Sequence, residues 1–173
     1  MEIKIRKAKL SELDQIDRIL ASGREYLHSR GLPQWQNGYG PTRGMAEEDI
    51  KRGDGYVLEA GGIICGYAAM VGGIEESYAD IRGEWDETHK KYITIHRVAI
   101  NASSRSTGLS GPFMRGLIKI AARRKYRDIR IDTYPKNDIM QRVILRAGFT
   151  YRGTVQMPIP DGERLAYQLI ISN

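Results

Sequence analysis

The chain has 173 residues, with 27 lysines and arginines against 21 aspartates and glutamates, which gives a formal net charge of +6. This length suits one domain over 1–173 whose core needs neither a disulfide nor a structural metal, and the single Cys65 cannot form an internal bridge. No apolar stretch approaches the roughly 18–20 residues of a membrane span, and the N-terminus is unlike a signal peptide, so we expect a cytoplasmic protein.

The N-terminal part predicts a short strand and two helices. Ile3 and Ile5 alternate with charged residues, as in a half-exposed strand. Ser11 begins a helix-cap pattern, and apolar residues then recur at helical spacing for almost five turns. The segment 31–41 has the composition of a loop, and Met45–Arg52 predicts a short second helix.

The middle of the chain predicts a hairpin and a long connection. Tyr56–Ala60 and Ile63–Val71 are strand-like, and the two glycines between them are a strong two-residue turn signal. Gly72–Lys91 is a long, aromatic-bearing connection with six acidic residues between Glu75 and Glu87. Such a loop either attracts a cationic substrate or is a solvated surface.

The C-terminal half predicts alternating strands and helices. They are the strand Tyr92–Ile100, the helix Pro112–Tyr126, the strand Asp128–Tyr134, a helix capped by Asn137 and ending at Arg146, and the strands Thr150–Met157 and Glu163–Ile171. The whole chain therefore has the order β-α-α-β-β-β-α-β-α-β-β. This order predicts the α/β class, with a mixed sheet and helices on both faces.

The most informative segment is the loop Arg105–Gly111, which reads R-S-T-G-L-S-G. It joins the end of a predicted strand to the start of a predicted helix, where unpaired N–H groups and the helix dipole favour a phosphate group. Gly108 and Gly111 let the backbone approach a ligand closely. The alternative is an ordinary helix-capping turn.

Charge supports a phosphate ligand near this loop. Between Arg97 and Arg130 there are nine basic residues and one acid, Asp128. A basic surface of this kind attracts the phosphates of a nucleotide-like cofactor or of a nucleic acid. The stretch holds no known nucleic-acid reader motif, so nucleic acid is the weaker alternative.

The chain resembles the GCN5-related N-acetyltransferase (GNAT) superfamily along essentially its whole length. The matching motifs, in chain order, are I-H-R-V-A-I at 95–100, the loop at 105–111, I-R-I-D-T at 129–133, Asn137 with Met140-Gln141, and Gly148-Phe149. The resemblance implies a GNAT-like, mostly antiparallel twisted sheet of six to seven strands. It also implies that the strands at 92–100 and 128–134 splay apart.

The resemblance further implies acetyl-CoA as co-substrate and assigns residues to it. The backbone N–H groups from Ser106 to Gly111 would hold the pyrophosphate, and the backbone near Val98 and Ile100 would hold the pantetheine arm. Ser110 stands where the family usually has Gly or Ala. The full set of expected cofactor-binding residues is Val98, Ala99, Ile100, Arg105, Ser106, Thr107, Gly108, Leu109, Ser110, Gly111 and Asn137. Asn137 has the alternative of being only a helix cap.

The expected catalytic residues are His96 and Tyr134. An imidazole has an ordinary pKa of about 6.5, which suits a base near neutral pH, although His96 could instead be a buried, hydrogen-bonded core residue. By resemblance, the N–H of Val98 is the candidate oxyanion donor. The family usually places a proton-donating tyrosine where this chain has Ile144, so Tyr134 is the candidate substitute.

Other polar residues are secondary candidates. His89 and Glu84 lie on the acidic loop and could contribute to the site if the loop folds over it. Asp132 could orient a base, bind the amine, or be a buried partner of Arg97 or Arg130. The three histidines and one cysteine have no ligand-like spacing, so we expect no metal.

The leading functional hypothesis is an N-acetyltransferase that moves an acetyl group from acetyl-CoA to a small-molecule or peptide amine by direct attack on the thioester. One alternative is a non-catalytic acetyl-CoA sensor, which the absent tyrosine would suit. Another is a basic RNA-binding protein. The sequence implies no membrane partner, and the final strand pair offers a surface on which a homodimer could form.

Overall fold

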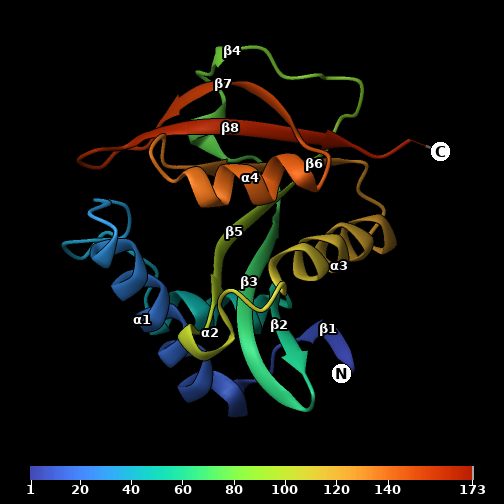
Figure 1. The fold of residues 1–173 in the computed structure, drawn as a ribbon. Coiled ribbons are helices and arrows are strands. Elements are labelled where there is room, and N and C mark those ends of the chain that lie inside the picture. Colours follow the sequence, from blue (N-terminus) through green and yellow to red (C-terminus); the bar gives the residue numbers. More distant parts are fainter. Residues whose placement is uncertain (173) are drawn as a thin grey trace.

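The computed structural model describes residues 1–172. The helices are α1 Leu13–Ser29, α2 Arg43–Arg52, α3 Ser110–Arg123 and α4 Asp138–Arg146. The strands are β1 Ile3–Lys7, β2 Gly55–Ala60, β3 Ile63–Gly72, β4 Arg82–Gly83, β5 Ile93–Ile100, β6 Asp128–Thr133, β7 Thr150–Gln156 and β8 Glu163–Ile170. They form one twisted sheet in the order β1-β2-β3-β5-β6-β8-β7-β4 (Figure 1).

The sheet is mixed and mostly antiparallel, as expected. Only β5 and β6 run parallel, and each is joined to the rest of the sheet through antiparallel neighbours. The described sheet has eight strands rather than six or seven, because the two-residue strand β4 pairs with β7 at Arg82 and Gly83. Two residues carry no periodicity, so the sequence pattern could not predict this strand.

Local signals explain most element boundaries. The predicted turn at Gly61-Gly62 is confirmed, since both glycines have positive φ values, 58° and 82°, between the paired strands β2 and β3. Thr42 accepts a hydrogen bond from the Met45 N–H at 3.1 Å, so α2 begins two residues earlier than predicted. The predicted Ser11 cap is wrong.

A short 3-10 turn, Leu10–Glu12, replaces the Ser11 cap. The carboxylate of Glu12 accepts a hydrogen bond from the Lys9 N–H at 2.8 Å, and α1 starts only at Leu13. The acidic side chain therefore reaches back to the chain before the turn, which a hydroxyl at position 11 does not do.

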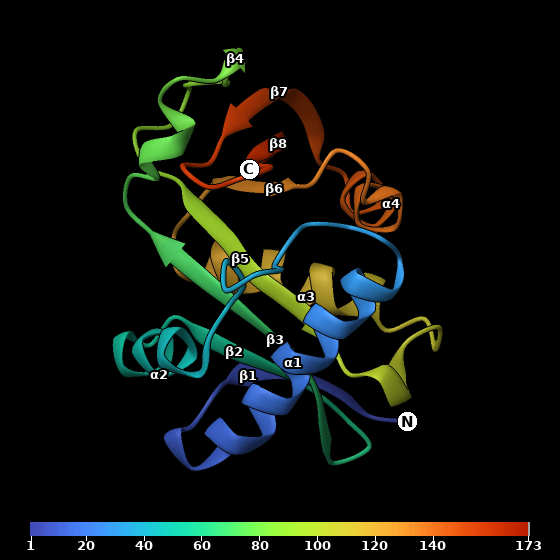
Figure 2. The ribbon, with the colours of Figure 1, turned by 90° about the vertical axis from the view of Figure 1, so that its left-hand side faces the viewer.

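Helices cover both faces of the sheet. Buried residues of α1 and α2, including Ile16, Leu20 and Ala46, pack against Val57 and Tyr67 on one face. The helices α3 and α4 pack on the other face, so that in Figure 2 α1 lies in front of the strands and α3 behind them. The prediction of helices on both faces is confirmed.

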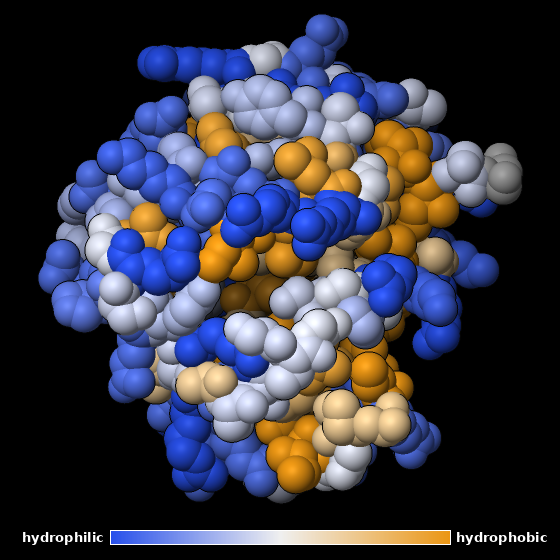
Figure 3. All heavy atoms as spheres, viewed as in Figure 1, coloured by the Kyte–Doolittle hydropathy of each residue, from blue (hydrophilic) through white to orange (hydrophobic). Residues whose placement is uncertain are grey.

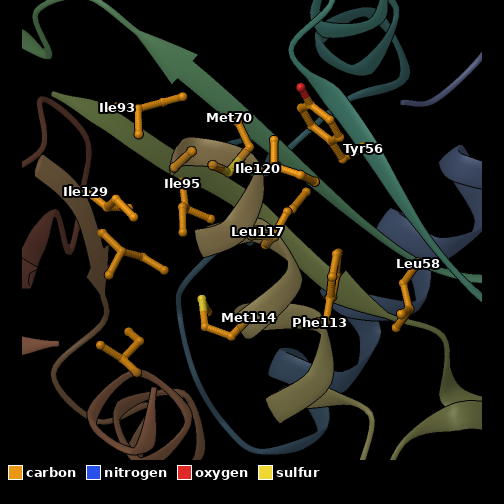
Figure 4. Close-up of a cluster of buried hydrophobic side chains, with 14 of the residues drawn as sticks. Tyr56, Leu58, Met70, Ile93, Ile95, Phe113, Met114, Leu117, Ile120 and Ile129 are labelled. Atoms are coloured by element: carbon orange, nitrogen blue, oxygen red, sulfur yellow. The ribbon is translucent and has the colours of Figure 1, made fainter. Parts of the chain in front are cut away.

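The larger core lies between α3 and the strands. Phe113, Met114 and Leu117 on α3 point toward the sheet, where they meet side chains such as Met70 and Ile95 (Figure 4). The two faces follow from strand alternation, which sends Tyr56 and Leu58 to α3 and Val57 to α1 and α2. This packing fixes the N-terminal end of α3 relative to β5.

The sheet divides into two halves where β5 meets β6. Their register holds only two pairs, Ile93 with Ile129 and Thr94 with Arg130. Beyond Thr94 the two strands have no ladder, which confirms the expected splay. The second half of β5 is therefore open on the side that faces β6.

A long segment over residues 73–92 covers one face of the second half-sheet. Its own Tyr78 and Trp85 are buried against Val155 and Ala166 of the sheet, and the Trp85 Nε1–H donates to the Tyr78 carbonyl at 3.0 Å. The guanidinium of Arg130 lies 4.2 Å from the ring of Trp85 and 3.9 Å from that of Tyr92. The acidic connection is thus an ordered cover and not a free loop. Within residues 1–172, no helix is both long and apolar enough to cross a bilayer.

Candidate active site

A cleft of about 950 Å³ opens at the splay between β5 and β6. Its lining comes from both sides of the sheet, with residues of β5, β6, α3 and α4 joined by Trp35 and Tyr39 from the loop after α1. Figure 3 shows the hollow near the centre of this side of the molecule, with apolar atoms at its floor and hydrophilic side chains at its rim. A ligand can therefore pass through the sheet between its two halves.

The loop before α3 presents free backbone donors to this cleft. The N–H groups from Ser106 to Gly111 donate no hydrogen bond to any residue that the structure describes. Gly108 has a φ of +78°, and the first turn of α3 carries no side-chain cap. Unpaired N–H groups at the start of a 14-residue helix form an anion-binding site.

Some of the expected loop residues line the cleft and others do not. Ser106, Gly108, Ser110 and Gly111 contribute to its wall. Leu109 is buried in the core, and neither its side chain nor that of Thr107 is part of the wall, so their expected role could be carried only by backbone groups.

Arg105 also lines the cleft but is held by α1. Its Nη2 donates to the carbonyl and to the hydroxyl of Ser22, at 2.8 and 2.7 Å, and its guanidinium lies 4.3 Å from the ring of Tyr26. Arg105 therefore fastens the loop to α1, and its contacts within the chain leave it less free for a phosphate than the resemblance implies.

The strand β5 carries a bulge in the middle of the cleft wall. Tyr67 pairs with Ala99 but Ala69 pairs with His96, so that β5 has one residue more than β3 over this interval. Arg97 has a φ of +56°, which is unusual for a residue with a side chain. Val98, which follows Arg97 in this bulge, lines the cleft.

Asp49 of α2 binds the side chain of Arg97 at this bulge. Its carboxylate is fully buried and accepts hydrogen bonds from Arg97 Nε and Nη2 at 2.8 and 2.6 Å. It also accepts one from the Tyr67 hydroxyl at 2.7 Å and one from Arg52 at 3.0 Å. The alternative that Asp132 is the buried partner of Arg97 is therefore wrong. Sequence reasoning missed Asp49 because an acid in a short helix has no pattern that marks it as buried.

His96 lines the cleft directly before the bulge. Its Nε2 lies 3.4 Å from Oε2 of Glu75, which is near the start of the segment 73–92. The interaction with His96 lowers the pKa of the Glu75 carboxyl below its ordinary value, so Glu75 is a carboxylate near neutral pH. His89 and Glu84, which the sequence suggested as contributors from the same segment, do not line the cleft.

Asp132 lies on β6, across the splay from His96. Its Oδ2 accepts a hydrogen bond from the buried Tyr78 hydroxyl at 2.6 Å, and burial raises the pKa of its carboxyl. Arg130 pairs with Asp128, at 2.9 and 3.2 Å, so the expectation that Asp132 is its partner is also wrong. Asp132 lines the cleft and remains a candidate to bind an amine.

Three positions were considered for protonating the departing thiolate, and they lie in different surroundings. Ile144 is fully buried in the core beside α3 and carries no acidic proton. Tyr134 is not part of the cleft wall, and its ring lies 5.5 Å from the Arg164 guanidinium. The Thr133 hydroxyl is buried, lines the cleft and has no partner among the described residues. Sequence reasoning did not single out this hydroxyl, because its neighbours are known only from the fold.

Asn137 caps α4 as predicted. Its Oδ1 accepts a hydrogen bond from the Met140 N–H at 3.2 Å, and its Nδ2 donates to Gln34 at 3.2 Å. It also lines the cleft, so a contact to a cofactor stays a prediction beside its confirmed role as a cap. Among residues 1–172 there is no cluster of side chains that could hold a metal ion.

Solved structures resemble the chain closely, although no protein-family model and no curated protein matches it. A GNAT-family acetyltransferase from Streptococcus agalactiae is 36% identical, with 99% of this chain and 96% of that chain covered and a TM-score of 0.90. A GNAT-family acetyltransferase from Listeria monocytogenes is 19% identical, with 98% and 95% covered and a TM-score of 0.76.

A third structure is an aminoglycoside acetyltransferase, AAC(6')-Ib, in complex with coenzyme A. It is 20% identical, with 98% of this chain and 95% of that chain covered and a TM-score of 0.69. At this level of identity the likeness shows the fold alone, whereas the streptococcal match is high enough to show the family.

Proposed function

Because the chain belongs to the GNAT family of acetyltransferases, we propose that it transfers an acetyl group from acetyl-CoA to the nitrogen of an amine by direct attack on the thioester. The observation that carries this proposal is the row of free N–H groups from Ser106 to Gly111 at the mouth of a cleft that passes between splayed strands. A pyrophosphate suits the row, and an amide-rich pantetheine arm suits the open side of β5.

The proposed chemistry forms a C–N bond and breaks the C–S bond of the thioester. The amine must lose a proton before or during attack, and His96, oriented by Glu75, is the candidate base. The N–H of Val98, a residue of the bulge that lines the cleft, is the candidate donor to the oxyanion. The departing thiolate takes a proton from water, since Ile144 cannot supply one and Tyr134, the candidate from the sequence, is not part of the cleft wall.

A binding and turnover experiment tests the proposal. Saturation with acetyl-CoA at about 100 times its Kd should stabilise the fold by about 2.7 kcal/mol, which for a chain of this size raises the Tm by roughly 2–4 °C per kcal/mol. Release of free thiol should then depend on an added amine. A chain whose Tm does not respond to acetyl-CoA contradicts the proposal.

A second candidate function is an acetyl-CoA sensor, and the buried Ile144 is the observation that favours it. A thiol is a fair leaving group without an acid, since its pKa lies near about 8.5, so the residue does not exclude turnover. Stabilisation by acetyl-CoA without thiol release, across a panel of amino acids, polyamines and peptides, would favour the sensor.

A further inference from the structure

Two arginines are buried on the same face of the second half-sheet, but only one of them has a carboxylate partner. Arg130 is 6% exposed, and its Nε and Nη2 donate to the carboxylate of Asp128. Arg164 is 5% exposed and forms no ion pair with any residue among 1–172. A buried cation without an anionic partner is costly, so the position of Arg164 in the cleft lining points to an anionic group on the ligand.

The chain holds Arg164 in place without neutralising it. Its Nη1 donates to the carbonyls of Asp161 and Glu163, both at 2.8 Å, while Nε and Nη2 donate to no group in the described part of the chain. Burial lowers the pKa of this guanidinium, as expected for a charge that has lost its water. Arg164 lines the cleft, so its free donors have a ligand site beside them.

Asp132 carries the charge opposite to that of Arg164. It lies on the neighbouring strand, and the pairing of Asp132 with Ala166 puts Arg164, two residues before Ala166, on the same face of the sheet. The two charges influence each other electrostatically, yet they are not within ion-pair distance. His96, the candidate base, lines the same cleft as Asp132.

The site is separate from the loop that would hold the pyrophosphate. The loop precedes α3, which packs on the opposite face of the sheet from the segment that contains Tyr78. Asp132 is hydrogen-bonded to Tyr78, so Asp132 and Arg164 lie on the side where an acceptor would meet a thioester that passes through the splay. An acceptor that satisfies both charges must carry an amine and an anionic group.

Building on the proposed function, we infer that the acceptor is a free α-amino acid, with its amine between Asp132 and His96 and its carboxylate on Arg164. A polyamine leaves the Arg164 guanidinium without a partner. An α-amino acid carries its amine and its carboxylate on one carbon atom, so one small molecule can offer an anion to Arg164 and a cation to Asp132, whose present partner is the neutral Tyr78 hydroxyl.

The test compares each L-amino acid with its carboxamide and its decarboxylated amine in the thiol-release assay. A charged hydrogen bond to Arg164 should give at least one amino acid a kcat/KM about ten- to hundredfold above its carboxamide. In Arg164→Met this preference should fall to near one, mainly through KM. Arg18→Met, an exposed substitution on α1 outside the cleft, should keep the wild-type preference.

The outcomes separate this inference from the proposed function. Thiol release with other amines, together with no preference for any carboxylate-bearing acceptor, overturns the amino-acid inference and leaves acetyl transfer standing. No stabilisation by acetyl-CoA and no turnover overturns both. If Arg164→Met does not fold, the wild-type comparison of matched acceptors decides the question alone.

Discussion

At the scale of single residues, the site depends on side chains that act through neighbours far away in the sequence. His96 contacts Glu75, and Arg97 contacts Asp49, so the two residues at the bulge are each positioned by a different segment. Motif matching found His96 and Arg97 because they are adjacent on one strand. It could not find Glu75 or Asp49, since only the fold brings these carboxylates to β5.

The base assignment is tested by His96→Gln. Loss of a general base should lower kcat/KM by about 10²- to 10⁴-fold and change the acid side of the pH–rate profile, with acetyl-CoA binding retained. Stopped assays of thiol release across pH measure this. The matched substitution His28→Gln, on α1 and far along the chain from β5, should leave the profile unchanged. An identical profile in His96→Gln removes His96 from the mechanism.

The anchor of the bulge is tested by Asp49→Ala. This change leaves Arg97 and the Tyr67 hydroxyl without their acceptor in a buried place, so we expect the free energy of unfolding to fall by about 3–5 kcal/mol. Denaturant titration measures this loss. Glu48→Ala, an exposed change on the same helix, should stay within about 0.5 kcal/mol of wild type. Equal effects of the two substitutions would mean that the network does not stabilise the fold.

At the scale of elements, the start of α3 shows how much of a structure a local sequence pattern can predict. The glycines of the loop and the following apolar stripe predicted a loop-to-helix junction, and the helix does begin there, at Ser110 instead of Pro112. The sequence could also predict free N–H groups, because every helix start leaves them. It could not predict that Arg105 is bound to Ser22, because that contact joins the loop to α1.

The phosphate role of this helix start is tested by Ser110→Glu. A carboxylate in the first turn should repel a pyrophosphate and lower acetyl-CoA affinity at least tenfold, as measured by titration calorimetry. The same charge interacts favourably with the helix dipole, by about 0.3–1 kcal/mol, so the Tm of the unliganded protein should be unchanged or higher. Ser110→Gln, which is similar in size and neutral, should bind much closer to wild type. Undiminished affinity in Ser110→Glu would place the anion elsewhere.

At the scale of the whole molecule, the cleft exists because two antiparallel half-sheets meet through only two residue pairs. Each half is covered by its own helices or by the segment 73–92, so each is stabilised separately. The gap between β5 and β6 beyond Thr94 can therefore stay open. Backbone groups on the open side of β5 are therefore available to a ligand that adds to the sheet like a strand.

The role of the splay between β5 and β6 in cofactor binding is tested by hydrogen exchange with and without acetyl-CoA. Peptides covering residues 95–100 should exchange faster in the unliganded protein and become protected on binding, because the ligand would replace the missing strand. Peptides from β8, which is paired with β6 and β7 on its two sides, should change little. Unchanged exchange over 95–100 in the presence of saturating acetyl-CoA would show that the ligand does not use the splay.

The sequence alone determined the order of the helices and of the strands other than β4, the turn at Gly61-Gly62 and the loop before α3, because each arises from forces between residues close in the chain. The charges that surround the acceptor side were decided only by the tertiary structure. Asp132, Arg164 and Glu75 come from three separate segments, and whether such a charge is paired, buried or free depends on which strands become neighbours.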